Sequence, residues 1–579
     1  MIKRIIILFI FSQASASELS PVLITTKTDS SVENSISSYE IIDREEDREL
    51  ENTFLHLKSL DIVKTGANGA TTLFLRGGLN KHTLILINGV PLRDASGIEN
   101  TLDLSGVSLH NIERVEVLKG NQSVLYGSDA INGVVNIILK NKISSSVELY
   151  GGVDKGASVN WGHSKRQRSL GFNYGHITNN SISEVKDDDE LDKKVLDYGS
   201  ITYQDNFRGH LVKLSSKLSK SFLETDSQDY SIDTPIGSRE DFNRKTLQVH
   251  QFSMSKNKFK LETSMNRVDR LNKTSNGEYN YRGTEKRVEV RYQSSEGVVS
   301  GIEYLRKDYL DNENDFNDDQ FELFANKEYV KKNRVFSLGL RQNSKDEDHL
   351  SSYKVGVLQK FSEKFQSGLS YGKSYKKPSL YQLYAPAISS DYPIGNKDLK
   401  AESAYEFEII NRVKLSKNTE LKLNLFDQRV LDYIAFETNN GYKNIHHQKT
   451  QGFELSYSTV LSDYSFLSLY FLHTKYEQSD ELEVERRPKN RGKVNFEHYF
   501  SNSWSLLTSL SLVGKRFEYI LEEKKELSSY EKLDIEFSWK DKDNRFSLQV
   551  ENLLGENYQE AAYYSVYKNA VQLKFNRQI

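Results

Sequence analysis

Apolar and polar residues alternate over most of the chain after residue 143. The alternation is clear in Val288–Tyr292, Leu421–Leu425, Leu533–Trp539 and Phe546–Val550. A period of two is typical of β-strands that have one apolar face and one polar face. Because the alternation continues almost to the last residue, we expect one large β-structure over residues 143–579.

Long polar stretches separate these segments and alternate with short connections. The long stretches are Ser183–Lys194, Glu224–Asn243, Asp308–Asp319, Ala385–Glu402 and Lys475–Asn490. Outer-membrane barrels pair long external loops with short periplasmic turns, and closure leaves no strand edge unpaired. About 435 residues can supply on the order of twenty tilted strands of about ten residues. The pattern therefore predicts a membrane all-β fold, a large antiparallel transmembrane β-barrel.

Residues 30–142 have a different pattern. They contain short apolar runs between glycine-bearing turns, at Leu73–Leu75, Leu84–Ile87, Val115–Leu118 and Val134–Leu139. Such spacing is typical of a small α/β unit. Within it, Arg48–Ser59 has apolar residues near helical spacing, which predicts a short amphipathic helix. Because a wide barrel encloses a lumen that needs a plug, we expect residues 30–142 to form a plug domain inside the barrel.

The first 29 residues precede this unit. Residues 1–16 combine a basic start, the apolar run Ile5–Phe11 and an Ala-Ser-Ala site, the features of a secretory signal peptide. The run is too short to cross a bilayer as a helix. Residues 17–29 form a polar lead with one β-prone segment, Val22–Thr26. That segment is either an ordinary first strand or a strand left free for a partner to pair with.

Composition narrows the class of protein. The chain has 33 tyrosines and 28 phenylalanines at a mean hydropathy of −0.62. An outer-membrane barrel has this balance because only every second strand residue faces lipid, although a soluble tyrosine-rich β-protein has it too. The net charge of −3 argues against a nucleic-acid partner. The absence of cysteine excludes disulfides, thiolate metal sites and cysteine catalysis, and no catalytic motif predicts an enzyme.

The chain contains several longer motifs, namely FLRGG (74–78), LILINGVPL (84–92), IERVEVLKGNQSVLYGSDAINGVVNIIL (112–139), YGKSYKKPSLYQLYA (371–385), DLKAESAYEFEI (398–409), QGFELSY (451–457) and VENLLGENYQ (550–559). Together they resemble motifs of the TonB-dependent outer-membrane receptors, most of all those of the cobalamin (vitamin B12) branch. The resemblance covers nearly the whole chain after the signal peptide. It implies a barrel of about 22 strands with a plug inside it, and uptake powered by an inner-membrane TonB complex.

The resemblance also implies a binding segment for TonB. The five residues Val22, Leu23, Ile24, Thr25 and Thr26 are similar to the TonB box of the family. A TonB-type energy-transducing protein in the periplasm would be the partner of this segment.

A charged cluster between plug and barrel is a second implication. Arg76 and Arg114 of the plug, with Glu402 and Glu454 of the barrel, resemble the cluster that holds the two parts together in this family. Guanidinium–carboxylate pairs at a partly dry interface are directional and can still rearrange. The alternative is a set of independent, solvated charges in the lumen.

Substrate contacts are expected on the outward plug loops, Lys64–Ala70 and Leu92–Thr101. The candidates are Thr65, Asn68, Arg93, Ser96 and Asn100. Small and amide side chains can hydrogen-bond a large, amide-rich ligand while its bulk approaches the backbone. Because ordinary turns use the same residue types, plain turn chemistry explains each of them equally well.

Acidic residues early in the barrel are candidates for calcium. They are Asp187, Asp189, Asp226, Asp229 and Asp233. Carboxylates supply the hard oxygen ligands that calcium needs, and the cobalamin branch carries calcium-binding loops in this region. The residues have no fixed ligand spacing, so a solvated acidic loop is the alternative. No other cofactor is expected.

These observations lead to one functional prediction. We expect a monomeric transporter in the outer membrane, exported by its signal peptide and surrounded by lipid, that imports a scarce nutrient. Cobalamin or another corrinoid is the first candidate, and a ferric siderophore or haem is the alternative. A passive porin or an adhesin with the same fold is a more distant alternative.

Overall fold

The computed structural model describes residues 39–579 except 44–47, 50–56, 66–68, 106, 110, 183–190, 226, 230–233, 237–240, 275–276, 313, 345–349, 388–393, 438–439, 480–484, 521–522 and 565. The predicted signal peptide and the segment Val22–Thr26 lie outside the described residues. Among the described residues, no helix is long and apolar enough to cross a membrane.

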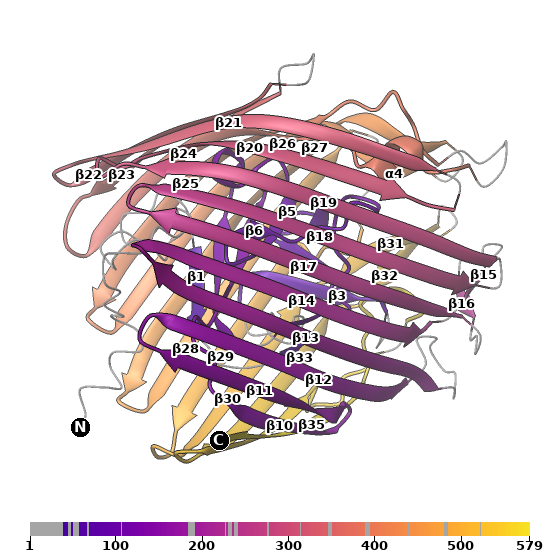
Figure 1. Ribbon diagram of the computed structural model, residues 1–579, viewed down its shortest axis with the longest axis vertical. Helices are drawn as coiled ribbons and strands as arrows, with labels where there is room; N and C mark the ends of the chain where they lie inside the picture. The colour runs from indigo at the N-terminus through magenta and orange to yellow at the C-terminus, as the bar shows by residue number, and fades with distance from the viewer. Residues whose placement is uncertain are drawn as a thin grey trace.

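The described part of the chain after residue 143 forms a closed barrel of 22 antiparallel strands (Figure 1). Neighbours in the barrel follow chain order, and the last strand pairs with the first, with Phe575 opposite Leu149. Closure satisfies the backbone donors and acceptors of both end strands. The strands are β10 (Ser146–Gly152), β11 (Lys155–Lys165), β12 (Arg168–Ile182), β13 (Leu191–Phe207), β14 (His210–Glu224), β17 (Phe242–Lys256), β18 (Phe259–Thr274), β19 (Gly277–Gln293), β20 (Val298–Leu310), β21 (Asp315–Lys331), β22 (Arg334–Asn343), β23 (Ser351–Lys360), β24 (Phe365–Lys376), β25 (Glu402–Ser416), β26 (Thr419–Glu437), β27 (Gly441–Ser462), β28 (Ser465–Gln478), β29 (Asn490–Tyr499), β30 (Trp504–Val513), β33 (Tyr530–Lys540), β34 (Asn544–Glu551) and β35 (Ala570–Gln578).

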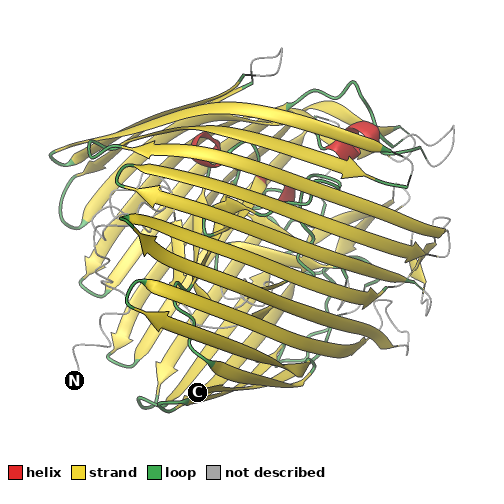
Figure 2. Cartoon of the chain, in the orientation of Figure 1, coloured by secondary structure: helices red, strands yellow, loops and turns green. Residues whose placement is uncertain are grey.

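The two ends of the barrel differ in the length of their connections. One end has tight turns such as 166–167 and 208–209, and we call it the short-turn end. The other, the long-loop end, carries the small hairpins β15 (Ser227–Asp229) with β16 (Thr234–Ile236) and β31 (Arg516–Ile520) with β32 (Glu523–Leu527). It also carries helix α4 (Leu380–Tyr384), shown red in Figure 2.

The prediction of a long loop at Asp308–Asp319 is wrong. Most of Asp308–Asp319 is strand, because β20 continues to Leu310 and β21 begins at Asp315. The acidic residues of this stretch therefore extend a hairpin instead of forming a long loop.

The alternation of the sequence separates two barrel faces. On β19, Val288 and Val290 are exposed on the outer wall, whereas Arg287, Glu289 and Arg291 are buried toward the lumen. The interior is thus lined by charge, and these charges need partners when the plug displaces water.

The plug lies inside the barrel (Figure 1). Its largest sheet has the order β1-β8-β9-β5-β6, in which β5 and β9 are parallel and the other neighbours antiparallel. The four apolar runs of the sequence lie in β4, β5, β8 and β9, as predicted. The plug elements are β1 (Tyr39–Asp43), β2 (Arg48–Glu49), β3 (Leu60–Lys64), β4 (Thr71–Leu75), η4 (Asn80–His82), β5 (Thr83–Ile87), β6 (Val90–Pro91), β7 (Ser108–Leu109), β8 (Ile112–Lys119), α3 (Ser123–Tyr126) and β9 (Gly133–Leu139).

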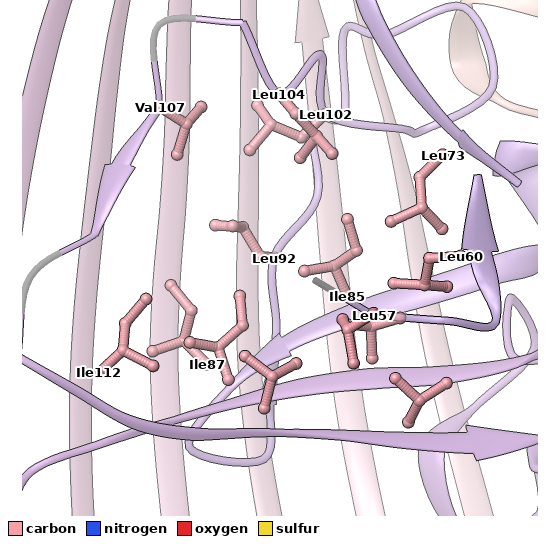
Figure 3. Close-up of a cluster of buried hydrophobic side chains, with 14 of the residues drawn as sticks. Leu57, Leu60, Leu73, Ile85, Ile87, Leu92, Leu102, Leu104, Val107 and Ile112 are labelled. Carbon is pink, nitrogen blue, oxygen red and sulfur yellow. The ribbon is translucent and has the colours of Figure 1, made fainter. Parts of the chain in front are cut away.

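The larger of two apolar clusters among the described plug residues lies at the centre of the plug (Figure 3). Leu57, Leu60, Leu73 and Leu75 join Ile85 and Ile87 of β5 there, and most of these side chains are almost fully buried. Leu247, Val249 and Val268 of the barrel wall complete the cluster. Barrel side chains therefore complete the apolar core of the plug, so the plug buries this core fully only inside the barrel.

The helix predicted at Arg48–Ser59 is not present in the described part of that stretch. Arg48–Glu49 form strand β2, which pairs with β7, and Leu57–Ser59 are not helical. Residues 50–56 lie outside the described residues.

A glycine at the start of β9 sets how closely the plug packs. Gly133 has φ of +150°, and a Cβ at this position would lie 2.3 Å from the Leu118 carbonyl oxygen. We expect Gly133→Ala to destabilise the plug by about 1–3 kcal/mol through overpacking. Limited trypsin digestion of the purified protein would measure this as faster plug cleavage. Gly151→Ala, where a Cβ meets nothing within 4 Å, is the matched control, and equal cleavage of the two variants would contradict the expectation.

Candidate functional site

A tight plug turn presses against the barrel wall directly after β4. Arg76 adopts the left-handed region with φ of 54°, which few residues other than glycine do, and Gly77 follows with φ of 68°. A Cβ on Gly77 would lie 1.9 Å from the Tyr476 hydroxyl oxygen of β28, so a side chain there would require the Tyr476 ring to move. Arg487 donates from Nη1 to the Gly77 carbonyl oxygen at 2.8 Å. The turn therefore fixes the direction in which Arg76 points.

Arg76 reaches three glutamates of the wall. Its Nε lies 2.8 Å from Glu454 Oε2, and its Nη2 lies 2.6 Å from Glu408 Oε1. Glu406 is 3.7 Å away. Burial alone would lower the pKa of the Arg76 guanidinium, but Glu408 and Glu454 outweigh it and raise that pKa above its ordinary value. Arg76 therefore stays charged in this dry site.

A second plug cation completes the set, which we call the Arg76 cluster: Arg76, Lys119, Glu406, Glu408 and Glu454. Lys119 Nζ lies 2.9 Å from Glu454 Oε1. Glu406 Oε2 accepts a hydrogen bond from the Asn121 backbone N–H at 2.6 Å. Charge-assisted bonds of this kind hold a buried interface only while every partner is in place.

Glu402 belongs to a separate contact. Its carboxylate lies 2.9 Å from Lys81 Nζ and 2.7 Å from His82 Nε2, both in η4 of the plug. Lys81 also donates to the Ile434 carbonyl oxygen at 2.8 Å. Burial lowers the pKa of His82 despite the neighbouring carboxylate. This contact fastens the plug at a second point of the wall.

Arg93 lies in a third contact between plug and wall. Its Nε is 2.6 Å from Asp129 Oδ2 of the plug, and its Nη1 is 3.2 Å from Glu285 of β19. Lys376 of β24 lies 2.8 Å from Asp129. Burial opposes ionisation of Asp129, but Lys376 and Arg93 prevail and hold its pKa well below the ordinary value. Arg93 was expected to contact substrate, and the structure instead places it, 5% exposed, in this buried network.

The structure brings together part of the predicted charged cluster. Arg76 and Glu454 are in contact, whereas Glu402 pairs with Lys81 and His82. Arg114 was expected to reach the barrel as well. Its ion pairs are instead with Glu113 and Glu116 of its own strand.

The other four plug residues that were predicted to contact substrate belong to the two predicted loops. Ser96 and Asn100 are buried, and Ser96 Oγ donates to Asp94 Oδ1 at 2.7 Å. Thr65 closes the β3–β4 turn, with its backbone N–H donating to the Ala70 carbonyl oxygen at 3.1 Å. Asn68 lies outside the described residues. Thr65, Ser96 and Asn100 thus take part in the hydrogen bonds of turns.

Most of the predicted calcium ligands lie outside the described residues. Asp187, Asp189, Asp226 and Asp233 lie outside the described residues, and Asp229 is described only by its backbone in β15. No group of three or more potential metal ligands occurs among the residues that the structure describes.

An aromatic group lies above the outward plug loop at the long-loop end. The Tyr381 ring of α4 lies 6.4 Å, between centroids, from each of Tyr281, Tyr309 and Tyr442. Just before α4, Ser379 Oγ donates to the Ile98 carbonyl oxygen at 2.5 Å. Ile98 is 51% exposed, so the plug presents an apolar side chain at this surface.

Sequence reasoning missed several of these residues. Glu406 and Glu408 follow Glu402 at even spacing on β25, so the alternation places all three on the lumen face. Lys81, His82 and Asp129 carry no comparable signal, because each has a barrel partner, Glu402 or Lys376, that is more than 200 positions away in the chain.

Comparisons with known proteins agree with the arrangement of plug and barrel. Residues 26–134 match the family described as "TonB-dependent Receptor Plug Domain", and residues 143–553 match "TonB dependent receptor-like, beta-barrel". The chain is 23% identical over 609 residues to the vitamin B12 transporter BtuB of Photobacterium profundum, covering 96% of this chain and 93% of that protein.

Solved structures share the fold. A ferric enterobactin receptor (PfeA) variant from Pseudomonas aeruginosa has a TM-score of 0.75 at 14% identity, covering 93% of this chain and 98% of that one. The copper transporter OprC has a TM-score of 0.77 at 13% identity, with the same coverage of 93% and 98%. At such identities the likeness concerns the fold alone.

We expect the Arg76 cluster to hold the plug against the barrel wall. Removing the guanidinium in Arg76→Ala leaves three wall carboxylates with too few cations, and breaking a buried pair costs about 3–5 kcal/mol. We expect channel openings in planar bilayers at lower urea concentrations than in the unmodified protein. Arg114→Ala is the control, since Arg114 pairs with Glu113 and Glu116 inside the plug. The same urea dependence in both variants would show that the cluster does not hold the plug.

Proposed function

This chain belongs to the TonB-dependent receptors of the outer membrane, and from that premise we propose that it imports cobalamin or a related corrinoid. The members of this family are transporters and not enzymes, and they work with a TonB protein and a small-molecule substrate. The short-turn end of the barrel then faces the periplasm and the long-loop end faces outward.

One observation favours cobalamin over the other candidate substrates. The similarity to a vitamin B12 transporter extends over 96% of this chain, so it includes the plug as well as the barrel. The proteins of similar structure include a ferric enterobactin receptor and a copper transporter. Because that likeness reflects the fold alone, it does not favour either ligand.

The outward surface of the plug is compatible with a large, amide-rich ring. Ile98 offers an apolar contact, and the half-buried Tyr281 and Tyr381 of the barrel offer aromatic rings with hydroxyl groups at their edges, whereas Tyr309 and Tyr442 are buried. Ligands of this kind bind where apolar surface is combined with a few polar groups.

The plug topology suggests how pulling from the periplasm would act. The N-terminal segment leads into β1, an edge strand that pairs only with β8 in its sheet. A force on that segment reaches the Tyr39–Leu118 pair first and breaks the ladder one pair at a time. Glu40 accepts bonds from the Lys58 and Ser59 backbone N–H groups at 2.9 and 3.1 Å, so the force next reaches the segment before β3.

TonB dependence is tested with two deletions. Deleting Val22–Thr26 should abolish uptake of radiolabelled cobalamin by cells and leave binding to the purified protein unchanged, because the segment is proposed to contact TonB and not ligand. Deleting the five residues Ser30–Asn34 is the matched control and should retain uptake. Loss of both uptake and binding, or of neither, in the first variant would refute the proposed coupling.

Substrate class is tested by direct binding. The purified protein should bind cobalamin and fail to bind a panel of ferric siderophores and haem. Ile98→Asp should weaken cobalamin binding by about tenfold, because it replaces an apolar side-chain contact worth about 1–2 kcal/mol with a charged group. Ile98→Leu is the conservative control and should bind normally. If the protein bound an iron chelate in preference to cobalamin, the proposed corrinoid substrate would be wrong, and a ferric siderophore or haem would be the substrate instead.

A further inference from the structure

A small cavity lies between the plug and the inner wall of β12, β13, β14 and β17. Its volume is about 30 Å³, enough for one small ion or about two water molecules. Ile87, Leu139 and Lys140 line it from the plug, and Lys217 lines it from the wall. Plug and wall thus leave a small space between them here, in contrast to the direct pairs of the Arg76 cluster.

Lys217 of β14 directs its ammonium group into the interior. Its neighbours Ser216 and Leu218 are exposed on the outer wall, so the alternation of the strand turns Lys217 toward the lumen. The Lys217 Nζ atom is buried and has no hydrogen-bond partner among the described residues. None of the described residues that line the cavity is acidic. Lys217 is therefore a buried cation without a carboxylate in its own cavity.

Other buried lysines at the contact of plug and wall have acidic partners. Lys119 Nζ lies 2.9 Å from Glu454, and Lys376 Nζ lies 2.8 Å from Asp129. A buried ammonium group without such a partner is strongly unfavourable, so it either loses its proton or binds an anion. A second lysine, Lys140, lines the same cavity from the segment that follows β9. Two basic residues around one space, with no acidic residue in its described lining, favour the anion.

The remaining lining limits which anion fits. Ser200 stands directly opposite Lys217 in the ladder of β13 and β14, and Thr202 lies two residues farther along the same face. Both residues line the cavity, and each hydroxyl group can donate one hydrogen bond. Leu139 and Val249 add apolar surface. One ammonium group and two hydroxyls are too few donors for phosphate or sulfate, but they suit a monovalent anion.

We infer that this cavity binds a monovalent anion of the size of chloride, with Lys217 as its cationic ligand and Ser200 and Thr202 as hydrogen-bond donors. The anion takes the place of the missing carboxylate and stabilises the buried ammonium group. Because Lys140 belongs to the plug, the same ion links the plug to the wall across the cavity. The site is separate from the outward plug surface and does not depend on which substrate is transported.

The site is tested by crystallography of the full-length protein. Crystals grown in sodium bromide should show an anomalous bromide peak next to Lys217 Nζ. Lys217→Met nearly preserves the length of the side chain, removes its charge and should abolish the peak. Lys220→Met is the matched control and should retain the peak, because Lys220 is exposed on the outer face of the same strand. Water alone in the cavity, a peak that persists in Lys217→Met, or a peak lost in Lys220→Met would each overturn the inference.

A measurement in solution tests whether the ion binds only at crystal concentrations. Gluconate is too large for the cavity, so replacing chloride with gluconate at constant ionic strength should loosen the plug. Plug cleavage by trypsin should become about tenfold faster, as expected for an anion present at about ten times its dissociation constant. Lys217→Met should be cleaved at the same rate in both salts, whereas Lys220→Met should respond like the unmodified protein.

The unmodified protein alone can overturn the inference in this assay, even if a Lys217 variant fails to fold. Equal cleavage of the unmodified protein in chloride and in gluconate would show that no anion holds the plug. A dependence on chloride that persists in Lys217→Met would place the anion elsewhere and would overturn the inference as well.

Discussion

Charge pairing in a dry space governs the relation between plug and barrel. The lumen face of the barrel carries arginine, lysine and glutamate, and the plug excludes the water that would otherwise solvate them. Leaving such a charge unpaired costs more than the pair itself gains. Arg76 with its glutamates, Glu402 with Lys81 and His82, and Arg93 with Asp129 and Glu285 are three local solutions of this one constraint.

The same constraint explains how the plug can be both firm and removable. Contacts between plug and wall are made largely by side chains, including Arg487 to the Gly77 carbonyl and Arg270 to the Ser96 carbonyl, both at 2.8 Å. No described plug strand joins the barrel sheet. Side-chain pairs can be exchanged for water one at a time, whereas a shared β-ladder would tie the plug to the wall along a whole strand. Separation of such an interface would not require the barrel sheet to open.

Much of the fold, but less of the site, could be predicted from the sequence. Alternation identified the strands and their lumen faces because a period of two is a local property of the backbone. It failed at Asp308–Asp319, since strands that project beyond the membrane carry charges on both faces and resemble loops. The partners of Lys81, His82 and Arg93 depend on how the plug is rotated within the barrel. That rotation is set by packing between residues far apart in the chain, which no local pattern encodes.

The position of the apolar cluster limits how a signal can cross the plug. Leu73, Ile85 and Leu104 are nearly inaccessible and pack tightly, so this region resists small deformations. The charged contacts surround it and have discrete alternative partners, since Arg76 faces three glutamates and Glu402 faces two cations. The proposed ligand contact near Ile98 would therefore change the position of the whole plug by shifting which pairs are made. Under this proposal, a change in plug position, and not a change within its core, would reach β1.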